Sequence, residues 1–378
     1  MKPTSQYISL PYDFEKPLSD SRLYFHHKKI IPVLKLNKFV DKNLPHLKWV
    51  DFSKDIAKKE TTALKILAIF QNPLLRLGSN KNIIKNKEMF LAKLNYFISN
   101  DRPIIFNITQ IAFKIPNPLK TNRTTPDYGE LAFLSQFKDI INLIKKVYPR
   151  GAKIIILGES YIFYDVVGIS RHEADLYFKT INRWLKELKW NDEIILEDLA
   201  RLEKKTPNFK KEFINNLKEL KLGWENGSKG NKNEINNVLP TLYFSANVRK
   251  YSLPLLLEIF DFNKKDNSII GKRLKARLMK QTLINSFHYV AYHKTINTSR
   301  LADKLYPNSL KLSCTGSYGN LGIYPISKEA KLYCYHGIPY IYGNKKIKIM
   351  YHYDILRKKN IVAYYIKNEK TPFYYSNK

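Results

Sequence analysis

Apolar positions along residues 61–189 follow two different periods, which predict helices and strands in turn. Helical spacing is found in TTALKILAIFQNPLL (61–75) and KEMFLAKLNYFIS (87–99). RPIIFNIT (102–109) and the apolar run in RGAKIIILGES (150–160) carry the β-branched and aromatic residues typical of strands. A helical pattern follows each of these strands, in LAFLSQFKDIINLIKKVY (131–148) and SRHEADLYFKTINRWLKELK (170–189). The first of these helices is expected to bury one stripe, which consists of Leu131, Leu134, Phe137, Ile141 and Ile144.

A strand–helix–strand–helix order predicts βαβ units on a parallel sheet. The predicted fold class is therefore α/β, with a Rossmann-like parallel-sheet core and a smaller mixed α+β C-terminal part. We divide the chain into a helical N-terminal region (1–95), the Rossmann-like core (96–200), a lysine-rich helix with a linker (201–245) and a C-terminal α+β part completing the active site (246–378). The Gly/Ser/Asn/Lys stretch near residues 227–237 is the best candidate for a linker or a mobile loop.

Ligands of parallel α/β sheets gather beyond the carboxyl ends of the strands. The loop that leaves the first predicted strand carries three cations, Lys114, Lys120 and Arg123, which suit a phosphate or a carboxylate. The same loop also has a purely structural interpretation as a solvated connector. In that interpretation Thr125 is the N-cap of the next helix, Pro126 is its first residue, and Asp127 and Glu130 complement the helix dipole.

The second predicted strand ends in a turn with a carboxylate and a hydroxyl, Glu159 and Ser160. Asp165 follows a few residues later and is expected on the same side of the sheet. These acids could transfer protons or could only cap a turn, and the sequence leaves both interpretations open.

The sequence lacks the motifs of several common nucleotide-binding, hydrolase and metal sites. The chain has no GxGxxG, P-loop or GxSxG sequence. Its eight histidines and two cysteines show no metal-ligand spacing. The first residues lack the apolar segment of a signal peptide, and no run is long enough to span a bilayer, so we expect a cytoplasmic protein without a membrane partner.

The net charge of +32 suggests an anionic partner such as nucleic acid or a phosphorylated substrate. Lysine is scattered along the chain, however, so the charge fits compositional drift equally well. Tyrosine and lysine in the C-terminal strands would suit single-stranded nucleic acid, although sheet packing explains them more simply.

Four motifs in fixed order carry a family resemblance: AFKIPNP, TPDYGELAFL, VYPRGAKIIILGES and IFYDVVGIS. In this order and spacing they resemble the isocyanide (isonitrile) synthase family of pyoverdine/dityrosine biosynthesis proteins. RLKARLMKQTL and LYPNSLKLSC, further along, resemble the family's later helix and its Arg-Leu-Ser strand. The resemblance covers about residues 100–190 and extends to about 270–340, and it is absent from the first hundred residues.

The resemblance implies a reaction in secondary metabolism. The amino group of an L-amino acid, tyrosine or tryptophan, becomes an isonitrile, and C2 of ribulose 5-phosphate supplies the carbon. The reaction needs no metal or redox cofactor, and a downstream tailoring oxygenase is a further partner that the resemblance suggests.

The resemblance also implies roles for residues. Those expected in catalysis are Lys114, Asp127, Glu130, Glu159 and Asp165. Those expected to bind substrate are Phe113, Asn117, Lys120, Arg123, Ser160, Lys311 and Ser313.

The chain departs from the family pattern at three places. An Asp-Gly turn is replaced by Gly158–Glu159, no histidine follows Leu312–Ser313, and a Thr-Pro-Trp-His element is reduced to Ile338–Pro339–Tyr340. Two alternatives therefore stay open beside the enzyme: a non-catalytic relative that binds a sugar phosphate, and a basic nucleic-acid-binding or ribonucleoprotein component.

Overall fold

A parallel sheet of five strands runs through the centre of the computed structural model. The model describes residues 27–31, 35–109, 114, 120–121, 123–158, 169–199, 206–247, 269–298, 301–314, 319–330, 332–343 and 346–377. The strand order is β4-β3-β2-β5-β6, and all neighbouring pairs are parallel. The strands are β2 (Ile104–Thr109), β3 (Ala152–Gly158), β4 (Ile194–Asp198), β5 (Leu310–Ser313) and β6 (Leu321–Gly322). The predicted α/β class and Rossmann-like parallel core are confirmed.

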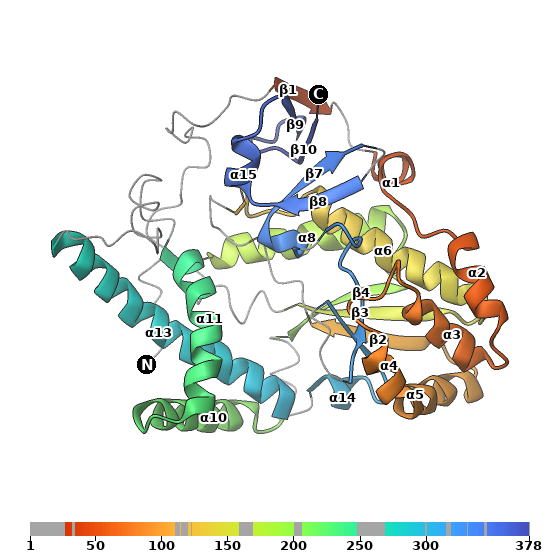
Figure 1. Ribbon diagram of the computed structural model, residues 1–378, viewed down its shortest axis with the longest axis horizontal. Helices are drawn as coiled ribbons and strands as arrows, with labels where there is room; N and C mark the ends of the chain where they lie inside the picture. The colour runs from red at the N-terminus through yellow and green to blue at the C-terminus, as the bar shows by residue number, and fades with distance from the viewer. Residues whose placement is uncertain are drawn as a thin grey trace.

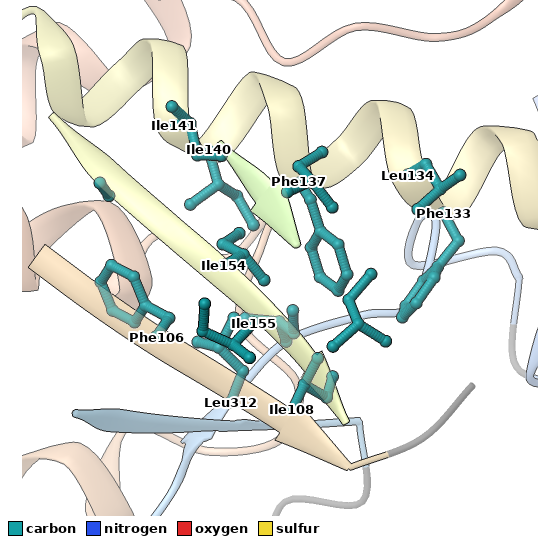
Figure 2. Close-up of a cluster of buried hydrophobic side chains, with 14 of the residues drawn as sticks. Phe106, Ile108, Phe133, Leu134, Phe137, Ile140, Ile141, Ile154, Ile155 and Leu312 are labelled. Carbon is teal, nitrogen blue, oxygen red and sulfur yellow. The ribbon is translucent and has the colours of Figure 1, made fainter. Parts of the chain in front are cut away.

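The central strands are apolar because both faces of the sheet are covered. In the sheet, Phe106 of β2 lies opposite Ile154 of β3 and Leu310 of β5. Helix α6 (Tyr128–Lys145) contacts β3 and β4, and Figure 2 shows side chains from this helix, among them Phe137 and Ile140, over the strands. Helix α3 (Thr62–Gln71) extends this layer, because the ring of its Phe70 lies 5.2 Å from that of Phe106.

Helix α6 is buried nearly all round, with fifteen of its eighteen residues inaccessible to solvent. The sequence predicts a single buried stripe, and the difference has a structural reason. Figure 1 shows α6 and α8 (Arg171–Glu187) between the parallel sheet and a second sheet, which covers the other side of α6. Polar residues of α6 are consequently buried as well, and Gln136 donates a hydrogen bond to the Tyr324 carbonyl at 2.8 Å.

The second sheet is mixed and has the order β1-β9-β10-β7-β8. Its strands are β1 (His27–Ile31), β7 (Ile338–Tyr342), β8 (Lys346–Met350), β9 (Ile361–Ile366) and β10 (Tyr374–Asn377). Strand β1, from the N-terminal part of the chain, pairs in parallel with β9 near the C-terminus. The short helices η3 (Cys334–His336) and α15 (His352–Leu356) precede β7 and β9.

The remaining described helices fall into a set of five and a separate group of three. The first set comprises α1 (Leu36–Asn43), α2 (Val50–Ala57), α4 (Lys81–Lys85), α5 (Lys87–Ser99) and α14 (Leu301–Leu305). The group of three comprises α10 (Phe209–Glu225), α11 (Lys229–Asn247) and α13 (Ile269–Thr298), which lie at one side of the molecule (Figure 1). None of the helices within the described ranges is long and apolar enough to cross a membrane.

The prediction of a linker near residues 227–237 is wrong, because helix α11 occupies most of that stretch. The composition is poor in apolar residues, but α11 gains its stability from tertiary packing rather than from propensity. Its Ile235 is fully buried in a small core with Leu220 of α10 and with Phe287 and Ala291 of α13.

Gly337, between η3 and β7, is a position that excludes larger residues. A Cβ atom there would lie 2.6 Å from the Met350 carbonyl oxygen and 2.7 Å from Ile349 Cγ2, both on the neighbouring strand β8. We expect Gly337→Ala to lower the free energy of unfolding by roughly 1–3 kcal/mol because strand backbone must move. Urea denaturation measures this loss.

Gly230→Ala in α11 is the matched control, because its Cβ would meet nothing within 4 Å. It should leave stability unchanged or raise it by up to about 1 kcal/mol. Equal effects of the two substitutions would contradict the close packing at Gly337.

Candidate functional site

The parallel sheet reverses its strand order between β2 and β5. Strands β3 and β4 lie on one side of β2, whereas β5 and β6 lie on the other. Ligands of open α/β sheets bind in the crevice beyond the carboxyl ends of the strands at such a reversal. Ser313 ends β5 there, and the loop containing Lys114 follows β2.

A buried ion cluster lies on this loop and on the start of α6. Lys114 Nζ lies 2.9 Å from Asp127 Oδ2 and 3.2 Å from Glu130 Oε1, and all three side chains are fully buried. The ammonium group also donates to the carbonyl oxygens of Cys334, at 2.5 Å, and Gly337, at 3.0 Å. We call Lys114, Asp127 and Glu130 the Lys114 cluster. It joins the loop after β2, the start of α6 and the segment before β7.

The same two carboxylates form the N-terminal cap of α6. Asp127 is the N-cap, with its Oδ1 accepting from the Gly129 N–H at 2.8 Å, and Glu130 Oε2 accepts from the Asp127 N–H at 2.8 Å. The expected N-cap at Thr125 with Pro126 as first helical residue is therefore wrong. A capping box needs a Glu or Gln three residues after the cap, and Glu130 supplies it only to Asp127. Capping and ion pairing with Lys114 use different oxygens of the same carboxylates.

Burial sets the charge state of the cluster. Burial lowers the pKa of Lys114, but the charges of Asp127 and Glu130 raise it by more, so the lysine stays protonated. Burial raises the pKa of Asp127 well above its usual range; Lys114 opposes this rise and the charge of Glu130 adds to it. Two carboxylates and one lysine without solvent would leave a costly net negative charge. We therefore interpret the cluster as holding one proton on its carboxylates, chiefly on Asp127.

Two further groups beside the cluster were not predicted from the sequence. Burial, followed by the charge of Glu130, raises the pKa of the fully buried Tyr177 hydroxyl. Burial, again followed by Glu130, raises the pKa of the Cys334 thiol, which is thus a neutral group and no nucleophile. In the sequence Tyr177 belongs to the apolar stripe of α8, which is indistinguishable from ordinary core.

His336 of η3 is a third such group. Burial, and then the positive charges of Lys120 and Lys114, lowers the pKa of His336 to about 3. The imidazole is therefore neutral at pH 7. Its ring packs 4.6 Å from that of Tyr335. The pKa of Lys120 is itself lowered by burial, and the Lys120 Nζ lies 5.8 Å from the centre of the Tyr351 ring.

The other predicted residues are placed differently. Arg123 is buried, and its Nη2 lies 2.7 Å from Glu369 Oε2 and 2.7 Å from Thr125 Oγ1, so its side chain ties the loop to the segment before β10. Lys311 points to Asp303 of α14, at 3.7 Å. The structure thus brings Lys114, Asp127 and Glu130 together, with Lys120 close to them. Outside the described residues lie Phe113, Asn117, Glu159, Ser160 and Asp165.

No group of three or more histidine, cysteine or acidic side chains is arranged to hold a metal ion within the described part of the chain. The Lys114 cluster itself supplies one ammonium and two carboxyl groups, and the phenol of Tyr177 lies beside it.

Comparison with known proteins identifies the region that carries this geometry. The sequence pattern of the family "Pyoverdine/dityrosine biosynthesis protein" matches residues 94–245, which include β2, the Lys114 cluster, α6, β3 and α8. Over these residues the chain resembles the pyoverdine/dityrosine biosynthesis family. The resemblance predicted from the four motifs is thereby confirmed.

Two relatives come from Fischerella ambigua. The L-tryptophan isonitrile synthase AmbI2 is 34% identical over 111 residues, which are 29% of this chain and 34% of the relative. The L-tryptophan isonitrile synthase AmbI1 is 37% identical over 98 residues, or 26% of this chain and 31% of the relative. The aligned stretches thus span about a third of the length of these two relatives.

The fold likeness extends further than the sequence likeness. The crystal structure of the PvcA protein from Pseudomonas aeruginosa matches with a TM-score of 0.64 at 18% identity. The match covers 83% of this chain and 100% of that protein. The likeness of fold to PvcA therefore extends to parts of the chain outside residues 94–245.

The neutral state of His336 predicts a pH dependence of stability. Unfolded histidine has a pKa near 6.5, whereas the folded value is about 3, so the native state binds fewer protons between these values. Stability is therefore fully present above pH 6.5 and falls with decreasing pH, by up to about 1.4 kcal/mol per pH unit. We expect His336→Gln to flatten the plot of unfolding free energy against pH between pH 6.5 and 4.5 by close to one proton.

His46→Gln is the matched control. The hydrogen bond with Asp139, opposed by burial, raises the pKa of His46, so its contribution is present at low pH and is lost as pH rises. Its removal should therefore steepen the plot or leave it unchanged. An unaltered slope in His336→Gln would show that this imidazole is not buried in its neutral form.

Proposed function

We propose that the protein is an isonitrile synthase that converts the amino group of an aromatic L-amino acid to an isonitrile, with ribulose 5-phosphate as carbon donor. The observation that carries the proposal is the Lys114 cluster: a buried lysine and two carboxylates on the motif segment that matches the family, beside the strand-order reversal of the parallel sheet. Both Fischerella relatives are L-tryptophan isonitrile synthases, which makes tryptophan the first amino acid to test.

The chemistry of the reaction suits such a cluster. The ammonium group must lose a proton before the amine attacks the keto carbon, and the keto oxygen must gain two protons in turn before it leaves as water. A carboxyl group with a raised pKa can supply and accept protons near pH 7. Asp127 has the raised pKa, and Lys114 stabilises the carboxylate that remains after proton release.

The proposed substrates also need cations. The amino acid has a carboxylate and the sugar has a phosphate. Lys120 is a cation near the cluster, since its charge lowers the pKa of the neighbouring His336. Lys120 is therefore proposed to bind one of these anions. A tailoring oxygenase that takes up the isonitrile product remains part of the proposal. Neither the family match nor the relatives favour the nucleic-acid alternative.

Glu130→Gln tests the proposed role of the cluster. Glutamine can still serve in a capping box, so helix α6 should keep its start, while one carboxylate of the cluster is lost. We expect isonitrile formation to fall by about a hundredfold or more, as for removal of a proton-transfer group. The assay incubates purified protein with ribulose 5-phosphate and L-tryptophan or L-tyrosine, and mass spectrometry detects the product.

Glu173→Gln is the matched control because Glu173 has the same position in the capping box of α8. It should leave the rate within about twofold of the wild type. A folded Glu130→Gln variant as active as the wild type would contradict the role of the cluster. A folded wild type that gives no isonitrile from any amino acid would reject the catalytic proposal.

A further inference from the structure

A cavity of about 360 Å³ lies beyond the carboxyl ends of β5 and β6. Cys314, which follows β5, and Gly322, which ends β6, form one wall. The opposite wall comes from the loop between α3 and α4, with Arg76, Gly78 and Ser79. This loop belongs to the first hundred residues, where the sequence suggested no site.

The loop is fixed to the edge of the sheet by backbone hydrogen bonds. The Leu77 N–H donates to the Gly322 carbonyl at 3.0 Å, and the Tyr324 N–H donates to the Leu75 carbonyl at 2.9 Å. Arg76 itself forms an antiparallel bridge with Ile323. The position of Arg76 relative to the strand ends is therefore set by the backbone.

The Arg76 side chain is held in one orientation. Its Nε donates to the Gly78 carbonyl at 3.1 Å and its Nη1 donates to the Gln71 carbonyl at 3.0 Å. Neither bond uses Nη2. A planar guanidinium fixed on one side is well prepared to bind an anion through its remaining edge.

The charge and shape of the cavity fit a single small anion. Among the described residues that line it, Arg76 is the one charged side chain, and no carboxylate is present to neutralise it. Gly78 has φ +77° and leaves the space beside it open, since an added Cβ would meet nothing within 4 Å. Ser79, which is exposed, adds a hydroxyl donor at the rim.

The cavity also lies close to the Lys114 cluster. Cys314 forms part of its wall, and this thiol is near enough to Cys334 to raise the pKa of the Cys334 thiol. The Cys334 carbonyl in turn accepts a hydrogen bond from Lys114. An anion at Arg76 would thus be separated from the cluster by the two cysteines.

We propose that this cavity binds a phosphate monoester, with Arg76 as the principal ligand and Ser79 as a second donor. The anion site rests on the cavity and its arginine. The identification of the rest of the ligand as a pentulose rests on the proposed function. Arg76 would then place the phosphate at the ends of β5 and β6, with the sugar extending toward the Lys114 cluster.

Binding to the full-length protein tests the site. Titration calorimetry and thermal shift would use inorganic phosphate, ribulose 5-phosphate and unphosphorylated ribulose, at constant ionic strength because surface lysines attract any anion. We expect both phosphates, but not ribulose, to bind and to raise Tm through mass action. Arg76→Gln should raise both dissociation constants by at least about tenfold because it removes a charge-assisted pair.

Two further variants keep the test independent of folding. Ser79→Asp places a negative charge at the rim without touching the hydrogen bonds of Arg76, and should weaken phosphate binding to a similar extent. Arg150→Gln removes an exposed arginine that is paired with Asp101, at the amino ends of β2 and β3, and should leave binding unchanged.

The outcomes separate this inference from the proposed function. Phosphate binding that is equal in the wild type, Arg76→Gln and Ser79→Asp would overturn the site even if the protein makes isonitriles. A wild type that binds neither phosphate would also overturn it. Phosphate binding lost in both variants, in a protein that forms no isonitrile, would support the site and reject the proposed reaction.

Discussion

The fully buried ion pairs and hydrogen bonds of Lys114 join helix α6, which covers the parallel sheet, to the segment that enters the mixed sheet. The ammonium group binds the carboxylates at the start of α6 and two carbonyl groups from the segment before β7. Loss of one partner in such a buried network typically costs about 3–5 kcal/mol, because the other charges remain without solvent. The Lys114 side chain therefore links the start of α6, the loop after β2 and the entry into the mixed sheet. Gly337 takes part in this network through its backbone carbonyl, which accepts a hydrogen bond from Lys114. Strand β8 lies so close to Gly337 that it leaves no room for a Cβ atom.

The same constraint gives the site its chemical character. Asp127 and Glu130 each use one oxygen to cap α6 and the other to face Lys114. The carboxylates are consequently held rigidly and away from water, which raises the pKa of Asp127. Structural and chemical interpretations of these residues are thus not alternatives: the helix cap is what positions the carboxyl groups. Burial also keeps the neighbouring His336 and Cys334 neutral, because it lowers the pKa of the imidazole and raises the pKa of the thiol.

Local pattern predicted the elements of the central region well. The apolar runs predicted β2, β3, α6 and α8, and all four are present. The sequence suggested a group of site residues, Lys114, Asp127 and Glu130, because the short motifs that contain them occur in the same order as in the isonitrile synthase family. Their mutual contact could not be derived, since it depends on carbonyl groups more than 200 residues away at Cys334 and Gly337.

Tertiary contact explains most of the errors, but the error at Thr125 has a local cause. Asp127 is the better N-cap in sequence because Glu130 completes a capping box with it, and the ion pair with Lys114 adds to this preference. Helix α11 looked like a linker because its stability comes from Ile235 packing between α10 and α13. Arg76 could not be recognised from sequence because its relevance depends on its bridge to Ile323, nearly 250 residues further along.

The central claim is that the Lys114 cluster keeps one carboxyl proton at neutral pH. Infrared difference spectroscopy measures this directly, since a protonated carboxylic acid has a carbonyl band that carboxylates lack. We predict that the wild type at pH 7 shows such a band and that the band disappears in the folded Asp127→Asn variant. A wild type without the band, or a band that survives in Asp127→Asn, would contradict the account.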